Sequence, residues 1–112
     1  MIASFCKYER IRHKNDFKRI YEQGKKIRSS SFVVYIAQDG QRQERRLGIT
    51  ARKKLGNAVT RNRCKRRVRE LFRRNKEIFP PGTDVIVVIT QNMVGKRYAE
   101  LEEEFYSIRQ QV

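Results

Sequence analysis

The side chains with the clearest chemistry in this chain are cations gathered in one segment. Between Arg45 and Lys76, 32 residues carry fourteen Lys or Arg and a single acid, Glu70, so thirteen of the fifteen net positive charges lie there. Residues 1–44 carry +5 and residues 77–112 carry −3, so the basicity is local and not a property of the whole composition. The segment predicts a polyanionic partner, and phosphate backbones fit best.

A basic helix can also be a solvated surface or a membrane-binding helix, and the pattern argues against both. A solvated face usually interleaves acids with cations four residues apart, whereas Glu70 is the only acid here. A membrane helix needs a broad apolar face, but the spacing of Cys64, Val68, Leu71 and Phe72 makes a narrow stripe that a small core requires. Nucleic acid is therefore the expected partner, and no membrane is expected.

A helix is predicted from about Ala58 to Arg74 with Asn57 as its N-cap. Arg61-Asn62-Arg63 lies near its start and places hydrogen-bond donors there as well as charge. Arginine grips phosphate with a planar fork of donors, and the first-turn N–H groups of a helix also favour anions. Asn62 either adds a donor and an acceptor to this surface or bonds a backbone carbonyl of the preceding loop, and the sequence leaves both roles open.

The chain offers no hydrolytic machinery of its own. It has one histidine, His13, no spaced carboxylate cluster, and two cysteines 58 positions apart outside any metal-binding motif. We expect no zinc site, disulfide or small-molecule substrate, and Cys64 is expected to be a buried apolar residue. No long apolar run occurs and Met1 to Cys6 do not form a secretory signal, so a soluble, cytoplasmic protein is expected.

The length of 112 residues and the mixture of helix and strand patterns predict a single α+β domain spanning 1–112. A first helix is expected over 15–24, beginning at Asn15 and ending at Gly24, and residues 25–31 form a connection or a short edge strand. Strands are expected at 32–37 and 46–51, paired as a hairpin around Asp39-Gly40.

The C-terminal third predicts one strand and one helix. The apolar run 84–90 is typical of a strand covered on both faces, and it forms a crossover with 46–51 if the two strands are parallel. A helix follows Gly95. Its expected inward stripe is Tyr98, Leu101, Phe105, Ile108 and Val112, and Glu102, Glu103 and Glu104 are expected to point away.

The segment from Lys53 to Arg69, with Arg61-Asn62-Arg63 opening a basic helix, resembles the hallmark of the bacterial ribonuclease P protein component. The resemblance extends over most of the chain, including Asp16-Phe17, Gly24, the strand from Phe32 to Tyr35 and Leu47-Gly48-Ile49. It implies a mostly antiparallel sheet of about four strands with three helices, in the order αβββαβα, and an unusual left-handed βαβ crossover.

The resemblance also implies a function and partners. The chain would be the protein subunit of a ribonucleoprotein that removes 5′ leaders from precursor tRNA, with catalysis and most of the Mg²⁺ in the RNA subunit; protein ligands for metal stay unassigned. A ribosomal or ribosome-assembly protein of similar fold is the alternative. The residues expected to face the catalytic RNA are Lys53, Lys54, Arg61, Asn62, Arg63, Lys65, Arg66 and Arg69.

By the same resemblance, a cleft between the first helix and the sheet takes the single-stranded leader and is lined by Phe17, Tyr21, Val33 and Tyr35. Single strands are held on aromatic platforms flanked by cations, which tolerate varied sequence. Strand alternation separates Val33 and Tyr35 from the neighbouring core face, so Tyr35 is the better ligand contact. Phe17 fits a core position at least as well.

Overall fold

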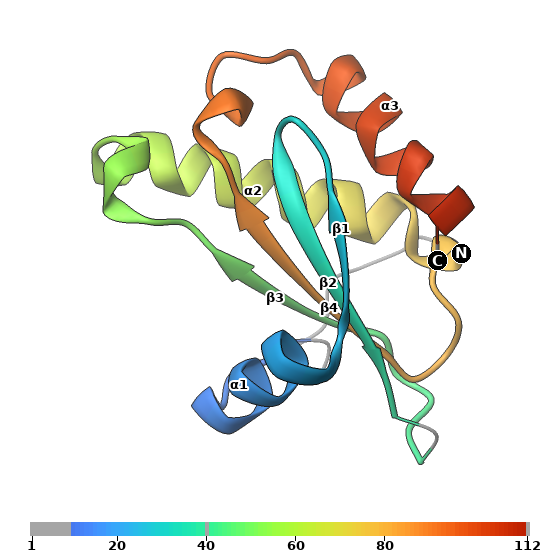
Figure 1. Cartoon of the computed structure of the whole chain (residues 1–112). Coiled ribbons are helices and arrows are strands. Elements are labelled where there is room, and N and C mark those ends of the chain that lie inside the picture. The colour runs from blue at the N-terminus through green and yellow to red at the C-terminus, as the bar shows by residue number, and fades with distance from the viewer. Residues whose placement is uncertain (1–9, 40, 112) are drawn as a thin grey trace.

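The computed structural model describes residues 10–39 and 41–111, which form three helices and a four-stranded sheet (Figure 1). The helices are α1 (Lys14–Gln23), α2 (Ala58–Arg74) and α3 (Tyr98–Ile108). The strands are β1 (Lys25–Arg28), β2 (Phe32–Gln38), β3 (Arg46–Thr50) and β4 (Thr83–Ile89). Short 3-10 turns η2 (Lys53–Leu55), η3 (Lys76–Ile78), η4 (Gln91–Met93) and η5 (Arg109–Gln111) complete the described chain. This α+β architecture is the predicted one.

The sheet has the strand order β1-β2-β4-β3, so the predicted hairpin between residues 32–37 and 46–51 is wrong. β4 lies between them, antiparallel to β2 and parallel to β3. Its buried apolar run needs cover on both faces, which only a central strand receives. The backbone after β2 bonds to the turn before β4, where Asp39 N donates to Gly82 O at 2.9 Å. Gly40 itself lies outside the described residues.

β3, α2 and β4 form the crossover that the sequence suggested, because β3 and β4 are parallel neighbours. α2 begins at Ala58, and the Asn57 side chain accepts a hydrogen bond from Thr60 N at 2.9 Å, which confirms Asn57 as the N-cap. α1 ends before Gly24 as predicted, and it begins at Lys14, one residue before the predicted start. The left-handed sense of the crossover stays a prediction.

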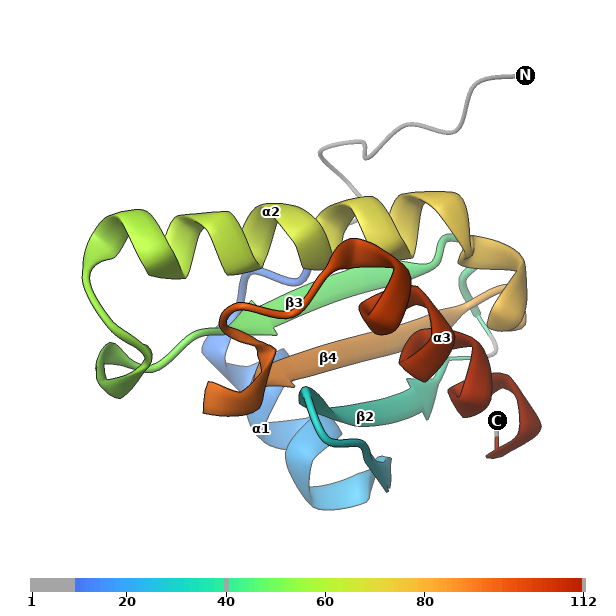
Figure 2. The ribbon, with the colours of Figure 1, turned by 90° about the horizontal axis from the view of Figure 1, so that it is seen from above.

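Two apolar clusters lie on opposite faces of the sheet. The larger joins the face of Phe32, Val34 and Ile36 to α2 and α3. The smaller places Ile20 of α1 against Ile86 on the other face, so α1 and α3 lie on opposite sides of the sheet (Figure 2). This alternation along β2 is the predicted one, and it leaves Val33 and Tyr35 on the α1 face, half-buried.

A buried carboxylate ties α1 and β3 to the central strand. Asp84 of β4 is the only buried charged residue among those described, and its side chain is fully buried. It accepts hydrogen bonds from Arg19 at 2.8 Å, Arg42 at 2.7 Å, and Arg46 at 2.8 and 2.9 Å. Burial acts to raise the pKa of Asp84, but the bonds from these arginines outweigh it and hold the pKa below its ordinary value.

α3 packs Leu101, Phe105 and Ile108 inward as predicted, with Tyr98 half-buried; Val112 lies outside the described residues. Glu104 was expected to point away, and that expectation is wrong. Its carboxylate accepts hydrogen bonds from Ser31 N at 2.9 Å, Ser31 Oγ at 2.5 Å, Lys96 Nζ at 3.2 Å and Ser29 Oγ. The serine-rich turn between β1 and β2 supplies these donors, so Glu104 fastens α3 to that turn.

Replacing Glu104 with Gln is expected to lower the free energy of unfolding by about 1–2 kcal/mol at neutral pH, because bonds to a charged acceptor are lost. Burial opposes ionisation of Glu104, but the serine and lysine donors win and lower its pKa from 4.5 to about 2. As pH falls, the unfolded chain is protonated first, so this stabilisation is complete above pH 4.5 and is lost towards pH 2.

Urea unfolding followed by circular dichroism at pH 7 and pH 3 measures this difference. Glu103→Gln is the matched control, since Glu103 is exposed on the same helix. The loss of unfolding free energy in Glu104→Gln should be smaller at pH 3 than at pH 7. Equal losses in the two variants at both pH values would contradict the role of Glu104 in holding α3 to the turn.

Candidate nucleic-acid interface

The cationic face of α2 follows from its narrow apolar stripe. Cys64, Val68, Leu71 and Phe72 point into the core, which confirms Cys64 as a buried apolar residue. Burial also raises the pKa of the Cys64 thiol. The other residues of α2 are exposed or half-buried, and most of them are arginine or lysine.

The eight residues predicted to face RNA share one surface region formed by η2 and the first three turns of α2. Each is exposed or half-buried, and none has a side-chain hydrogen bond or ion pair with any described residue. They are Lys53, Lys54, Arg61, Asn62, Arg63, Lys65, Arg66 and Arg69. The structure therefore presents an uncompensated cationic surface, here called the α2 surface.

The cations on the rest of α2 are held by protein partners. Arg67 donates to the backbone oxygen of Lys96 at 2.6 Å, and Glu70 accepts from Arg74 at 2.7 Å and from Arg73. Hydrogen bonds from Arg73, the strongest influence, and Arg74 lower the pKa of Glu70. The single acid of the basic segment thus pairs with the C-terminal end of the helix and leaves the N-terminal end unpaired.

Asn62 lies exposed on α2, and its amide has no hydrogen-bond partner in the described part of the chain. The backbone-bonding role that the sequence left open is therefore not the one observed. The turn into α2 depends instead on Gly56, whose φ of 139° suits glycine, and on the Asn57 cap.

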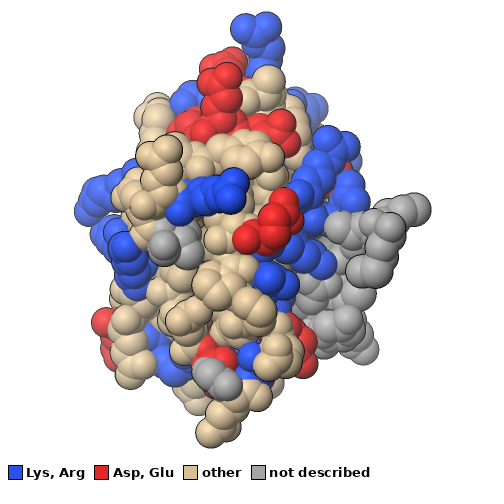
Figure 3. All heavy atoms as spheres, turned by 90° about the vertical axis from the view of Figure 1, so that its right-hand side faces the viewer, with Lys and Arg blue, Asp and Glu red and all other residues tan. Residues whose placement is uncertain are grey.

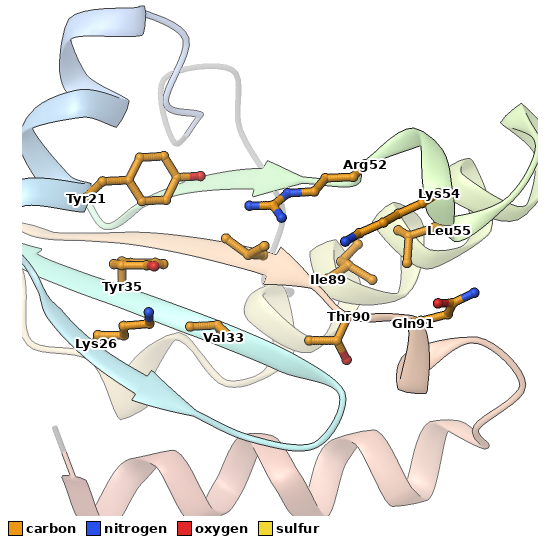
Figure 4. Close-up of a pocket in the computed structure, with 11 residues that line it drawn as sticks. Tyr21, Lys26, Val33, Tyr35, Arg52, Lys54, Leu55, Ile89, Thr90 and Gln91 are labelled. Atoms are coloured by element: carbon orange, nitrogen blue, oxygen red, sulfur yellow. The ribbon is translucent and has the colours of Figure 1, made fainter.

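A cleft of about 550 Å³ opens on the α1 face of the sheet (Figure 4). Its floor comes from β2 and β4, and η2 and η4 close one end. In Figure 4, Tyr21 reaches in from α1, while Arg52 and Lys54 lie over the cleft from the side of β3 and η2. The lining residues are Tyr21, Lys26, Val33, Tyr35, Arg52, Lys54, Leu55, Val88, Ile89, Thr90 and Gln91.

Two tyrosines form one wall of this cleft. The rings of Tyr21 and Tyr35 meet edge to face, with centroids 4.8 Å apart and planes at 89°. The Tyr21 hydroxyl shares a hydrogen bond of 2.8 Å with the Thr50 hydroxyl. Lys26 Nζ lies 5.6 Å from the centre of the Tyr35 ring, a cation–π distance. The wall therefore combines aromatic rings with a neighbouring cation.

Three of the four residues predicted for a leader cleft come together here, namely Tyr21, Val33 and Tyr35. Phe17 does not line the cleft. Its ring packs beside the Ile20–Ile86 cluster and over Gly48, where a Cβ would lie 2.7 Å from Phe17 Cζ. Phe17 is thus partly buried against this cluster, and it also lines a smaller hollow together with Lys65 and Arg69 of α2.

Among the polar residues of the cleft lining, the sequence analysis missed Lys26, Arg52, Thr90 and Gln91, and it placed Lys54 only on the RNA-facing helix side. Strand alternation could have identified Lys26. Ile27 faces the core, so Lys26 faces the cleft, and it pairs with Tyr35 in the β1–β2 register. Arg52 and Gln91 lie outside the strands, where periodicity gives no guide.

Charge is unevenly distributed around the molecule. Figure 3 shows the side that carries the end of α3, where acidic side chains gather near the top and an uncharged area lower down is flanked on both sides by Lys and Arg. Glu100, Glu102 and Glu103 are the α3 acids on the outer surface. A polyanion is therefore attracted to the α2 surface and the cleft, and much less to α3.

Within the described ranges, no three His, Cys, Asp or Glu side chains gather as metal ligands would; Cys6 lies outside those ranges. In the same ranges no helix is long and apolar enough to cross a membrane.

Comparison with known proteins identifies the family. A sequence model of the Ribonuclease P family matches residues 5–112. The ribonuclease P protein component of Thermotoga maritima is 38% identical over 112 residues, covering 100% of this chain and 92% of the relative. That of Staphylococcus epidermidis is 45% identical over 82 residues, covering 73% of this chain and 70% of the relative.

Solved structures agree with the sequence comparison. The Thermotoga maritima ribonuclease P protein superposes with a TM-score of 0.81 at 33% identity, covering 93% of this chain and 97% of that chain. The Staphylococcus aureus ribonuclease P protein gives 0.82 at 34% identity, covering 91% and 93%. These matches favour this family over a ribosomal or ribosome-assembly protein, and the chain belongs to the ribonuclease P protein family.

Proposed function

We propose that this chain is the protein subunit of a ribonucleoprotein that removes the 5′ leader from precursor tRNA. In this proposal the α2 surface binds the catalytic RNA subunit and the cleft binds the leader. The observation that carries the proposal is the presence of two cationic surfaces of different character on one small domain: a helix face dominated by arginine and lysine, and a cleft with aromatic walls.

The α2 surface suits a folded RNA. Its side chains are long cations with almost no group that selects a base, so they bind phosphate and fix position without reading sequence. Their mutual repulsion in the free protein is relieved when phosphates neutralise them and counterions are released. Such a surface suits a permanent RNA partner.

The cleft suits a single strand. Val33 and Val88 give an apolar floor, and Tyr21 and Tyr35 offer ring surface for bases. Lys26 on one side and Arg52 on the other supply charge for the backbone. None of these groups selects one base strongly, which fits leaders of varied sequence.

Lys54 joins the two surfaces. It lines the cleft, and it stands in η2, four residues before α2 begins. RNA on the α2 surface and a leader in the cleft would therefore lie on either side of one short turn. This arrangement supports a role in which the protein holds the substrate next to the catalytic RNA.

The chemistry of cleavage is assigned to the RNA subunit. The side chains on both surfaces are cations, amides, aromatics, aliphatics and the Thr90 hydroxyl, with no carboxylate among them, whereas Mg²⁺ is usually held by carboxylate and phosphate oxygens. These residues do not fit a protein-held Mg²⁺ site, so the proposal places the ion with RNA phosphates. The protein contributes binding, position and charge neutralisation.

Replacing Tyr35 with Leu tests the cleft. Leucine keeps an apolar side chain beside Ile86 but removes the ring, and one stacked base is worth about 1–3 kcal/mol. Holoenzyme reconstituted with a bacterial ribonuclease P RNA should bind precursor tRNA about tenfold more weakly and mature tRNA unchanged. Equilibrium binding of both tRNAs gives the two dissociation constants.

Tyr106→Leu is the matched control, because Tyr106 is an exposed tyrosine on α3, far from the cleft lining. It should alter neither constant. An equal loss on precursor and mature tRNA in Tyr35→Leu would contradict leader binding in the cleft.

Replacing Arg66 with Ala tests the α2 surface. If Arg66 contacts phosphate, the plot of log affinity for the RNA subunit against log salt should become shallower by about one unit. Arg109→Ala removes the same charge from η5, away from the α2 surface, and should leave the slope unchanged. An unaltered slope in Arg66→Ala would remove this residue from the interface.

A further inference from the structure

α1 is held to the sheet by little apolar packing. Ile20 is its only buried residue, and it joins Ile11 and Ile86 in the smaller cluster, with Phe17 half-buried beside them. The rest of the helix is exposed or half-buried. A short helix with so few buried side chains needs polar anchors to fix its rotation on the sheet.

Arg19 is one such anchor. Its Nη2 donates to Oδ2 of Asp84 at 2.8 Å, and Asp84 lies at the N-terminal end of β4 with its side chain fully buried. Arg42, from the segment between β2 and β3, and Arg46 of β3 donate to the same carboxylate. The position of the Asp84 side chain therefore does not depend on α1. The Arg19 bond therefore ties α1 to a rigid point.

Tyr21 is the second anchor, two residues further along and so on a different side of the helix. Its hydroxyl pairs with Thr50 at the C-terminal end of β3, and its ring meets Tyr35 at 4.8 Å. Arg19 and Tyr21 thus reach opposite ends of the sheet. Together with the ion pair between Asp16 of α1 and Arg46 of β3, at 3.6 Å, they fix the rotation of α1. Tyr21 is the part of α1 that forms the cleft wall.

We infer that Arg19 is a positioning residue for leader binding: its bond to Asp84 sets the orientation of α1 and thereby holds Tyr21 against Tyr35 as the cleft wall. Arg19 does not line the cleft, so it acts through Tyr21 and not by touching the leader. The inference rests on the proposed leader-binding function of the cleft.

Arg19→Gln and Arg42→Gln form a matched pair for the test. Both remove one positive charge and one bond to the same oxygen of Asp84, at 2.8 and 2.7 Å. Each also removes an ion pair with a second aspartate, Asp16 for Arg19 and Asp39 for Arg42, but only Arg19 belongs to α1. The readout is the leader advantage, the dissociation constant of the holoenzyme for mature tRNA divided by that for precursor tRNA. Circular dichroism establishes a temperature at which all variants are folded.

Arg19→Gln should reduce the leader advantage about threefold to tenfold, while Arg42→Gln keeps it within about twofold. Adding Arg19→Gln to Tyr21→Ala should cause no further loss, because the two residues act through one wall. Arg19→Lys keeps the charge and one donor and should restore part of the advantage; it also serves if Arg19→Gln fails to fold.

Equal losses from Arg19→Gln and Arg42→Gln would overturn the inference, as would independent, additive losses from Arg19→Gln and Tyr21→Ala. Tyr35→Leu in the same assay separates this failure from failure of the proposed function. A loss in Tyr35→Leu without one in Arg19→Gln removes only the positioning role, whereas no loss in either removes leader binding in the cleft and the inference with it.

Discussion

A single buried carboxylate is the constraint on which the arrangement of this small domain depends. Asp84 stands on the central strand, and its three arginines come from α1, from the loop after β2 and from β3. An ionised group in such a place is tolerated only because its oxygens are fully paired. The pairing joins segments that share few apolar contacts, and it fixes the face of the sheet on which α1 and the cleft lie.

The pairing of the acidic side chains decides where positive charge is left unneutralised. Glu70 pairs with Arg73 and Arg74 at the end of α2, and Glu104 is occupied by serines and a lysine, so neither acid neutralises the first turns of α2. The cations of the α2 surface therefore have no acidic partner among residues 10–39 and 41–111, at a cost in self-repulsion. A ligand that supplies phosphates would remove this cost, so the proposed RNA binding would also stabilise the fold.

Local features could be predicted from the sequence, and features set by distant contacts could not. The start of α2 at Asn57, the end of α1 at Gly24 and the inward face of β2 depend on neighbouring residues alone. The position of β4 between β2 and β3 depends on residues more than thirty positions away, and the local turn preference of Asp39-Gly40 pointed to a hairpin that β4 displaces. For the cleft, strand alternation placed Val33 and Tyr35 correctly. Arg52 and Gln91 line the cleft from segments outside the strands, where side-chain alternation does not apply.

The central claim is that this chain binds and positions RNA while the RNA subunit cleaves it. The most direct test is cleavage of a precursor tRNA at low magnesium by the protein alone, by a bacterial ribonuclease P RNA alone, and by the two together. The account predicts leader removal by the mixture under conditions in which neither component acts alone. Cleavage by the protein alone, or no stimulation of the RNA by a protein that still binds it, would contradict the claim.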